Sequence, residues 1–258
     1  MRLLSLDDLT IEDERSFRHV GLYAELASIL RRSDYRFRVL PEGSNASWDR
    51  AVFLNLTFWG ASGGGDVLVD TTIPADVVAH VAWHHLATAA LVPAGTVPSA
   101  EALFLGESIA SAFDVYLVGR LLGHSPESSF LETQVPAMAD CAEAAGVSAE
   151  AFDALLATVA DAPERAFEAL RKLLFDATCT LFRATSLDDA HRELVKFDDH
   201  PLGCLLHRHE LSNWVLYAKA YALRTNEPDA TAIAIDRALA AAPVSLDWLT
   251  KHWVDGSL

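Results

Sequence analysis

The chain has 258 residues, of which 51% are apolar, and its formal net charge is −16. This length suffices for one large hydrophobic core or two small ones. The acidic balance argues against a surface for DNA or RNA, because phosphate groups need a basic counterpart. We therefore expect no nucleic-acid partner.

The cysteines and the N-terminal segment indicate in which cellular compartment the protein is found. Cys141, Cys179 and Cys204 are odd in number and far apart, so they fit neither a disulfide framework nor a CxxC metal site. The segment MRLLSLDDLTIEDERSF interrupts every short apolar run with a charge, unlike a signal peptide. No run reaches the length that spans a membrane. These features predict a cytoplasmic protein with packed thiols and no membrane partner.

The first third of the chain combines one helix with a small β-element. Residues 16–33 have the amphipathic pattern of a helix. Residues 51–59, AVFLNLTFW, are rich in β-branched and aromatic side chains, and the turn GASGGG separates them from a second short strand, DVLVD at 66–70. The two strands predict a β-hairpin over 51–70, after which the strand signal ends.

Two helices follow the hairpin and carry the candidate site. The first covers 74–91, with Pro74 suited to its first turn and Asp76 placed where a carboxylate favours the helix dipole. The second begins after the N-cap Ser99 and runs to Gly123, a residue typical of helix ends. The breaks in the remaining sequence predict further helices over about 148–160, 164–184, 187–197, 202–224, 228–241 and 245–253.

The predicted elements define a mainly α fold (α+β), in which a small N-terminal β-hairpin accompanies a helical domain. No internal repeat or low-complexity linker divides the chain, so we expect one α-rich domain over 1–258. Within it we distinguish the hairpin 51–70, a helix pair over 74–122 and a C-terminal helical part over 148–258.

The helix over 74–91 is mostly apolar, yet it carries three histidines within six residues. His80 and His84 are four residues apart, so their side chains project within about 40° of each other on a helix surface. Two imidazoles at this spacing are the usual way in which a helix presents two nitrogen ligands to one metal ion. His85 points about 100° away from His84 and is an alternative ligand, although a polar edge position is the simpler explanation.

The next helix offers an acidic third ligand. We assume that the two helices pack antiparallel across the 92–98 loop. His80 and His84 then lie roughly 16 and 10 Å from the loop, and Glu107 lies roughly 12 Å from it. Glu107 is therefore expected at the level of the histidine pair.

Neighbouring residues on the second helix support this arrangement. Gly106 and Ala110 are small enough to let the two helices approach closely. Asp114 lies about two turns beyond Glu107 on the same face. It is suited to hydrogen-bond the far ring nitrogen of a ligand histidine and so to fix the tautomer of that histidine.

Residues 51–122 resemble a known arrangement, in which a strand hairpin is followed by HxxxH on a helix and GESIASAFD on the next helix. The order is similar to the core of HExxH zincins with a glutamate third ligand. It is also similar to HExxH-type peptide-modifying proteins, some of which are iron/2-oxoglutarate peptide β-hydroxylases. The resemblance implies a zincin-like helix pair, with His80, His84 and Glu107 as metal ligands, and a peptide or small-molecule substrate.

One position departs from this pattern. Those families have glutamate after the first histidine, where this chain has Val81 in HVAWH. In zinc peptidases that glutamate is the general base that activates the metal-bound water, and valine accepts no proton. Peptidase chemistry by that route is therefore not expected, whereas metal binding is unaffected.

Two histidines and one carboxylate also form the facial triad of non-haem Fe(II) oxygenases, whose chemistry needs no glutamate base beside the metal. We therefore expect Fe(II), with zinc as the alternative, and 2-oxoglutarate as a candidate co-substrate. A cation is needed for the distal carboxylate of 2-oxoglutarate, and the sequence does not choose among Arg120, Arg208 and Lys219.

A second group of histidines, His200, His207 and His209, lies in DDHPLGCLLHRHELSNW, around a turn and the start of the predicted helix over 202–224. His207 and His209 would point about 160° apart on a helix, so they do not share a metal. His209 and Asn213 share a face, and one of them is a candidate contact to a substrate or co-substrate carboxylate. A surface role is the simpler explanation for each.

Three functions follow from these patterns. The leading hypothesis is a non-haem Fe(II) oxygenase or hydroxylase that acts on a peptide. The second is a zinc metallohydrolase with a displaced general base, for example Asp114 or Glu210. The third is a catalytically inactive zincin-like module that binds a peptide or a partner, which Val81 fits well. A purely structural alternative is an incidental histidine pair, with Glu107 and Asp114 bound to Arg120 or a core histidine.

Overall fold

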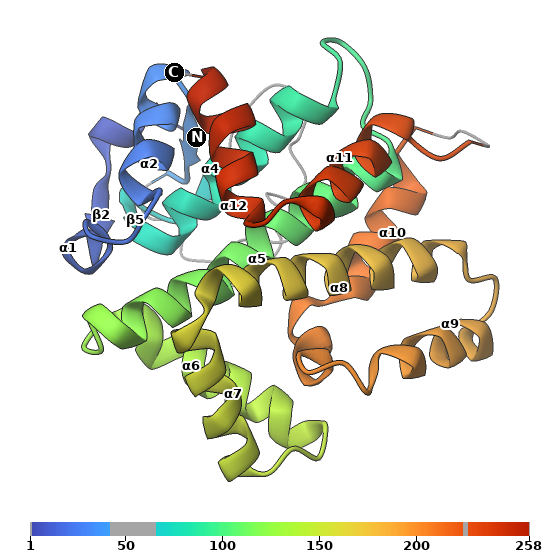
Figure 1. Cartoon of the computed structure of the whole chain (residues 1–258). Helices are drawn as coiled ribbons and strands as arrows, with labels where there is room; N and C mark the ends of the chain where they lie inside the picture. The colour runs from blue at the N-terminus through green and yellow to red at the C-terminus, as the bar shows by residue number, and fades with distance from the viewer. Residues whose placement is uncertain (1, 42–65, 224–226, 258) are drawn as a thin grey trace.

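The computed structural model describes residues 2–41, 66–223 and 227–257. The fold is mainly α-helical with a few short strands, as predicted (Figure 1). Helix α5 (Ala100–His124) runs through the middle of the molecule (Figure 1). Three helices that pack against it are α4 (Ala75–Leu91), α7 (Ala149–Asp161) and α8 (Pro163–Arg183).

Helix α5 is long and apolar enough to cross a membrane, contrary to the expectation that no run in this chain has that length. Its apolar residues occupy all sides of the helix rather than one stripe, which is the pattern of a helix enclosed by others. The most apolar 18-residue window of α5 is 89% buried inside the fold. The surrounding helices therefore cover the surface that a membrane span would expose to lipid.

The predicted N-cap Ser99 begins α5. Its Oγ accepts a hydrogen bond from the backbone N–H of Ala102 at 3.0 Å and donates one to Oδ2 of Asp229 at 2.6 Å. Asp229 in turn caps α11 (Ala230–Ala241) by accepting from two backbone N–H groups of its first turn. Two helix starts that are distant in the sequence are thus joined through their caps.

The described strands form two small sheets in the N-terminal part of the molecule. One sheet has the order β1–β3–β4, and the other pairs β2 with β5 in parallel. The strands are β1 (Arg2–Leu4), β2 (Thr10–Glu12), β3 (Phe37–Val39), β4 (Val67–Leu68) and β5 (Thr72–Pro74).

The predicted β-hairpin over 51–70 is described only in its second half. Its first strand, 51–59, lies outside the described residues. Strand β4 lies within the predicted second strand and pairs in parallel with β3. Strand β5 corrects the expectation that strands end at residue 70. It has three residues and pairs with a distant segment, so no local pattern indicates it.

The predicted helix over 16–33 is wrong as a single element. Helix α1 (Glu14–Phe17) ends early, and α2 (Tyr23–Arg32) begins after Leu22. The φ angle of Leu22 is 71°, and a non-glycine residue with this conformation interrupts a right-handed helix. The apolar side chains of α2 are nevertheless buried, and α2 packs against α4.

Helix α6 (Ser129–Ala144) lies where no element was predicted. Pro136 inside it is typical of a helix break, because proline lacks a backbone donor and clashes with the preceding turn. Helix α6 packs against α5 and against the 3₁₀ segment η3 (Gly203–His209).

The predicted helix over 202–224 is also wrong as a single element. The 3₁₀ segment η3 ends at His209, and helix α10 (Leu211–Tyr221) begins after Glu210. The φ angle of Glu210 is 47°, in the left-handed region, so the backbone changes direction between the two segments. His209 and Asn213 therefore do not lie on one continuous helix.

The other predicted C-terminal helices are confirmed with small shifts. Helices α7, α8 and α11 cover three of the predicted segments closely. The predicted helices over 187–197 and 245–253 each divide into an α-helix followed by a short 3₁₀ or π-helical segment. These pieces are α9 (Leu187–Leu194) with the 3₁₀ turn η2 (Val195–Phe197), and α12 (Ser245–Leu249) with the π-helical turn η4 (Thr250–Val254). Short 3₁₀ turns also occur as η1 (Leu6–Asp8) and η5 (Asp255–Ser257).

Candidate metal centre

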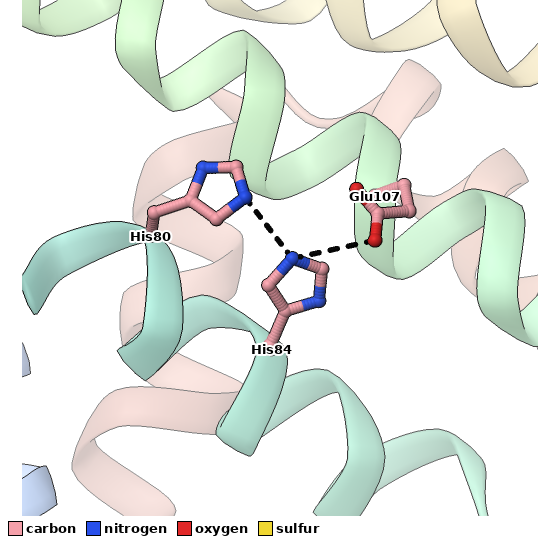
Figure 2. Close-up of side chains that lie close together, drawn as sticks. All are labelled: His80, His84 and Glu107. Atoms are coloured by element: carbon pink, nitrogen blue, oxygen red, sulfur yellow. Dashed lines mark hydrogen bonds and ion pairs between the residues drawn. The ribbon is translucent and has the colours of Figure 1, made fainter. Parts of the chain in front are cut away.

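Helices α4 and α5 bring His80, His84 and Glu107 to one point (Figure 2). The Nε2 atoms of His80 and His84 lie 3.1 Å apart, and Nε2 of His84 lies 3.5 Å from Oε1 of Glu107. One ligand atom from each residue lies within 4.8 Å of the other two. The predicted meeting of these three side chains is confirmed, and the cluster can hold a metal ion.

Small residues let the two helices approach at this level. A Cβ atom added to Gly106 would lie 3.2 Å from the Cβ atom of Ala87, which is tighter than ordinary packing. Ala110, one turn later on α5, is fully buried. Close packing of α4 on α5 therefore sets the distance across which a metal would be held.

The cluster is polar but poorly solvated. The side chain of Glu107 is only 2% exposed, whereas those of His80 and His84 are 16% and 28% exposed. Oε2 of Glu107 has no hydrogen-bond partner in the described part of the chain. A buried carboxylate oxygen without a partner costs free energy, and a shared cation would compensate for it. The donor set therefore fits a metal ion, with the more exposed histidine side open to a further ligand.

The pKa values of all three side chains are shifted from their ordinary values. Burial raises the pKa of Glu107 to about 8. Burial alone would lower the pKa of His80, but the charge and hydrogen bond of Asp114, helped by Glu107 and Asp66, raise it to about 9. Burial and the charge of His80 hold the pKa of His84 well below its usual value. Near neutral pH, His80 and Glu107 therefore carry protons that a bound metal ion would displace.

Asp114 anchors one of the candidate ligands. Its Oδ2 lies 3.3 Å from Nδ1 of His80, which leaves Nε2 of His80 directed toward His84. A carboxylate on the far nitrogen fixes the tautomer of a ligand imidazole and increases its basicity. This placement is the one expected for Asp114 from its position two turns beyond Glu107.

The three cations considered for a co-substrate carboxylate are already bound by protein groups. Arg120 forms an ion pair with Glu164. Arg208 donates to the backbone oxygen of Gln134 at 3.3 Å and also contacts its side chain. Lys219 donates at 3.3 Å to the backbone oxygen at the C-terminal end of α8. A role for any of them in binding 2-oxoglutarate stays a prediction.

His209, at the end of η3, is the member of the second histidine group whose pKa is influenced by the charge of His80. Its Nε2 is buried and has no hydrogen-bond partner among the residues that the structure describes. Burial, Arg208 and the charge of His80 lower the pKa of His209 to about 3, so its ring is neutral. His200 instead accepts a backbone N–H in its own turn at 3.1 Å, and His207 is exposed.

Two further carboxylates lie within electrostatic reach of His80. Asp76 was expected to favour the helix dipole in the first turn of α4. It does lie there, and burial together with the charge of Asp114 raises its pKa to about 6. Asp66 precedes β4, and its charge acts on both His80 and Glu107. The sequence held no signal for Asp66, because no helical or strand spacing relates residue 66 to the helix pair.

Position 81 presents no proton acceptor. Val81 is 4% exposed and packs in the core. Of the two bases suggested from the sequence, Asp114 is engaged with His80. Glu210 is exposed and accepts a hydrogen bond from Asn213 at 2.6 Å. Their roles as displaced bases stay predictions.

Comparisons with known protein families, with curated proteins and with solved structures find no match. The likeness to HExxH proteins therefore stays a hypothesis based on the order of the motifs. What the chain does has to be inferred from the chemistry of the site.

Proposed function

We propose that this protein is a metal-dependent enzyme whose ion is held by His80, His84 and Glu107. The observation that carries the proposal is the convergence of two imidazole Nε2 atoms and a buried carboxylate, one oxygen of which has no hydrogen-bond partner among the described residues. A purely structural network would pair both oxygens of a carboxylate that is 2% exposed. Two histidines and one carboxylate leave coordination positions open for substrates.

Within this class we propose a non-haem Fe(II) oxygenase or hydroxylase that acts on a peptide. Bound Fe(II) would supply oxygen activation, a chemistry that needs no general base at position 81. Val81 is consistent with this choice because its side chain is buried and aprotic. The peptide substrate is suggested by the resemblance to peptide-modifying HExxH proteins. The neutral His209 is the candidate contact to a co-substrate such as 2-oxoglutarate.

A zinc metallohydrolase is the second candidate. It is favoured by the additional carboxylates around His80, since one of them can replace the glutamate that HExxH hydrolases carry after the first histidine. An inactive module that binds a peptide or partner is the third candidate. It predicts that the His80→Ala substitution leaves binding of the partner intact.

Metal analysis and oxygen consumption together separate these three functions. The protein would be purified without chelators, analysed for metals, and then reconstituted with Fe(II) or Zn(II) under anaerobic conditions. One Fe(II) per chain, with oxygen consumption stimulated by 2-oxoglutarate in the absence of any peptide, supports the oxygenase. The His84→Ala variant should consume none.

Other results favour the alternatives. One zinc ion per chain, with no oxygen consumption by the iron form, favours the hydrolase. A wild-type protein that binds neither ion would overturn the metal-centre proposal and leave a binding module.

A further inference from the structure

A half-open cavity lies at one end of the helix pair α5 and α8, where α11 and η2 also contribute side chains. Its volume is about 360 Å³, which is within the range of sites for small molecules. Its apolar wall consists of Phe175, Phe197 and Ile233. None of the three candidate metal ligands lines this cavity, so it is a second candidate site that is separate from the metal centre.

Two opposite charges, Glu101 and Arg183, line the cavity. Glu101 is in the first turn of α5, and Arg183 is in the last turn of α8. These two helix ends meet, because the rings of Phe104 and Phe182, each within one turn of a charged residue, have centroids 5.6 Å apart. The helix dipoles favour an acid at the start of α5 and a base at the end of α8, which explains each charge separately. That both charges line one cavity is a consequence of how the helices pack.

Neither charge is neutralised within the described part of the chain. Glu101 and Arg183 form no ion pair there, so more than 4.0 Å separates the carboxylate oxygens of Glu101 from the guanidinium nitrogens of Arg183. The other acidic group of the lining, Asp176, is paired with Lys172. Burial raises the pKa of Cys179 to about 12, so its thiol is uncharged. The described lining therefore offers one acid and one base beside an apolar wall.

We infer that this cavity binds a small zwitterion with an apolar body, which is the chemistry of an apolar amino acid. The ammonium group of the ligand donates to Glu101, its carboxylate accepts from Arg183, and its side chain packs on the apolar wall. A guanidinium group presents a planar fork of donors that matches a carboxylate. A molecule with a single charge leaves the other charge of the cavity without a partner and binds more weakly. The inference does not depend on a bound metal ion.

Three ligands of similar size test this inference on the wild-type chain. L-Phenylalanine carries both charges, 3-phenylpropionate lacks the ammonium group, and 2-phenylethylamine lacks the carboxylate. An NMR titration of the isotope-labelled protein, in the presence of a metal chelator, measures the affinity for each ligand. We expect L-phenylalanine to bind about tenfold or more tightly than either of the others, since each of them loses a charge-assisted hydrogen bond.

Glu101→Gln and Arg183→Gln assign the two charges. Each variant should bind L-phenylalanine about tenfold more weakly than the wild type. Glu101→Gln should leave the affinity for 3-phenylpropionate unchanged, and Arg183→Gln should leave the affinity for 2-phenylethylamine unchanged, because the lost group has no partner on that ligand. The matched controls Glu25→Gln and Arg32→Gln remove the same charges from the first and last turns of α2. Both controls should bind L-phenylalanine like the wild type.

Three results would overturn the inference. The first is a wild-type protein that does not bind L-phenylalanine, and the second is a singly charged ligand that binds as tightly as L-phenylalanine. The third is a folded Glu101→Gln or Arg183→Gln variant that binds L-phenylalanine as the controls do. If a variant does not fold, as judged by circular dichroism, the comparison of the three ligands on the wild type decides. Because the chelator keeps metal out of the cluster, these results are independent of the proposed metal centre.

Discussion

Nδ1 of His80 on α4 lies 3.3 Å from Oδ2 of Asp114 on α5, so a candidate metal ligand is oriented by a carboxylate from the helix that also carries Glu107. One helix thus supplies both the acidic ligand and the group that orients a ligand of its neighbour. Removal of Asp114 should weaken metal binding without removing a ligand.

Asp114→Asn should lower the affinity for Zn(II) or Co(II) by about 10- to 100-fold, because the amide retains the shape but loses the charge that increases the basicity of His80. Competition with a chromophoric chelator measures this affinity. Asp34→Asn is the matched control. It also removes one negative charge, but Asp34 is exposed and pairs with Arg36 rather than with a candidate ligand. Equal affinities in wild type and Asp114→Asn would show that Asp114 has no role in orienting a ligand.

Replacement of a ligand should have a larger effect. His80→Ala, His84→Ala and Glu107→Ala should each lower metal affinity by more than about 100-fold, since each removes a coordinating atom rather than an outer partner. His85→Ala is the internal control, because His85 contacts the ring of Tyr35 and is not part of the cluster. Isothermal titration with Zn(II) distinguishes these cases. If His85→Ala lowered the affinity for Zn(II) as much as His84→Ala does, His85 would have to be counted among the metal ligands.

Metal affinity should rise with pH. Two ligands carry raised pKa values, about 9 for His80 and about 8 for Glu107, so a metal ion has to displace protons from them below those values. We expect the affinity for Zn(II) to increase by about tenfold or more per pH unit between pH 6 and pH 8, with protons released on binding. Titrations in buffers of different ionisation enthalpy count these protons. If the affinity for Zn(II) were constant between pH 6 and pH 8, metal binding would not displace protons from His80 and Glu107.

The metal-free protein should lose stability as pH rises. Glu107 has a folded-state pKa of about 8 against an ordinary value of 4.5, so the folded protein binds more protons than the unfolded chain between these values. Stability then falls with increasing pH across that window, on the order of a few kcal/mol in total. His80 acts in the same direction between 6.5 and about 9.

The Glu107→Gln variant isolates the contribution of Glu107. Glutamine has nearly the same shape and does not titrate, so the metal-free variant should gain stability relative to the wild type as pH rises from 5 to 8. Chemical denaturation in the presence of a chelator gives both free energies of unfolding. A stability difference that does not change with pH would mean that Glu107 is ionised in the folded protein.

Close packing at Gly106 should be required for the centre. Gly106→Val places side-chain atoms against Ala87, where even a Cβ would be 3.2 Å away, and should cost about 1–3 kcal/mol of stability while also weakening metal binding. Gly123→Ala is the matched control on the same helix, because nothing lies within 4 Å of an added Cβ there. It should raise stability by up to about 1 kcal/mol through helix propensity. Thermal unfolding and Zn(II) titration of both variants check this difference.

The amino-acid sequence by itself determined the features that depend on local spacing. The long apolar runs of α4 and α5, the cap at Ser99 and the four-residue spacing of His80 and His84 are all encoded within a few residues, and this spacing places the two histidines on one face. The level of Glu107 could also be predicted, from the assumption that a short loop joins two antiparallel helices and from the fixed rise per residue of a helix.

Only the tertiary structure decided which charged groups surround the face of α4 that carries His80 and His84. The charge of Asp66 acts on His80, and Asp66 directly precedes β4, whose pairing with β3 no local pattern in either strand predicts. Arg120 is bound by Glu164, and the backbone turns at Glu210 with a φ of 47°, although helical periodicity predicted a continuous segment there. Local periodicity reports the conformation of neighbouring residues. The partner of a charge depends on the packing of segments that are distant in the sequence, which no local pattern contains.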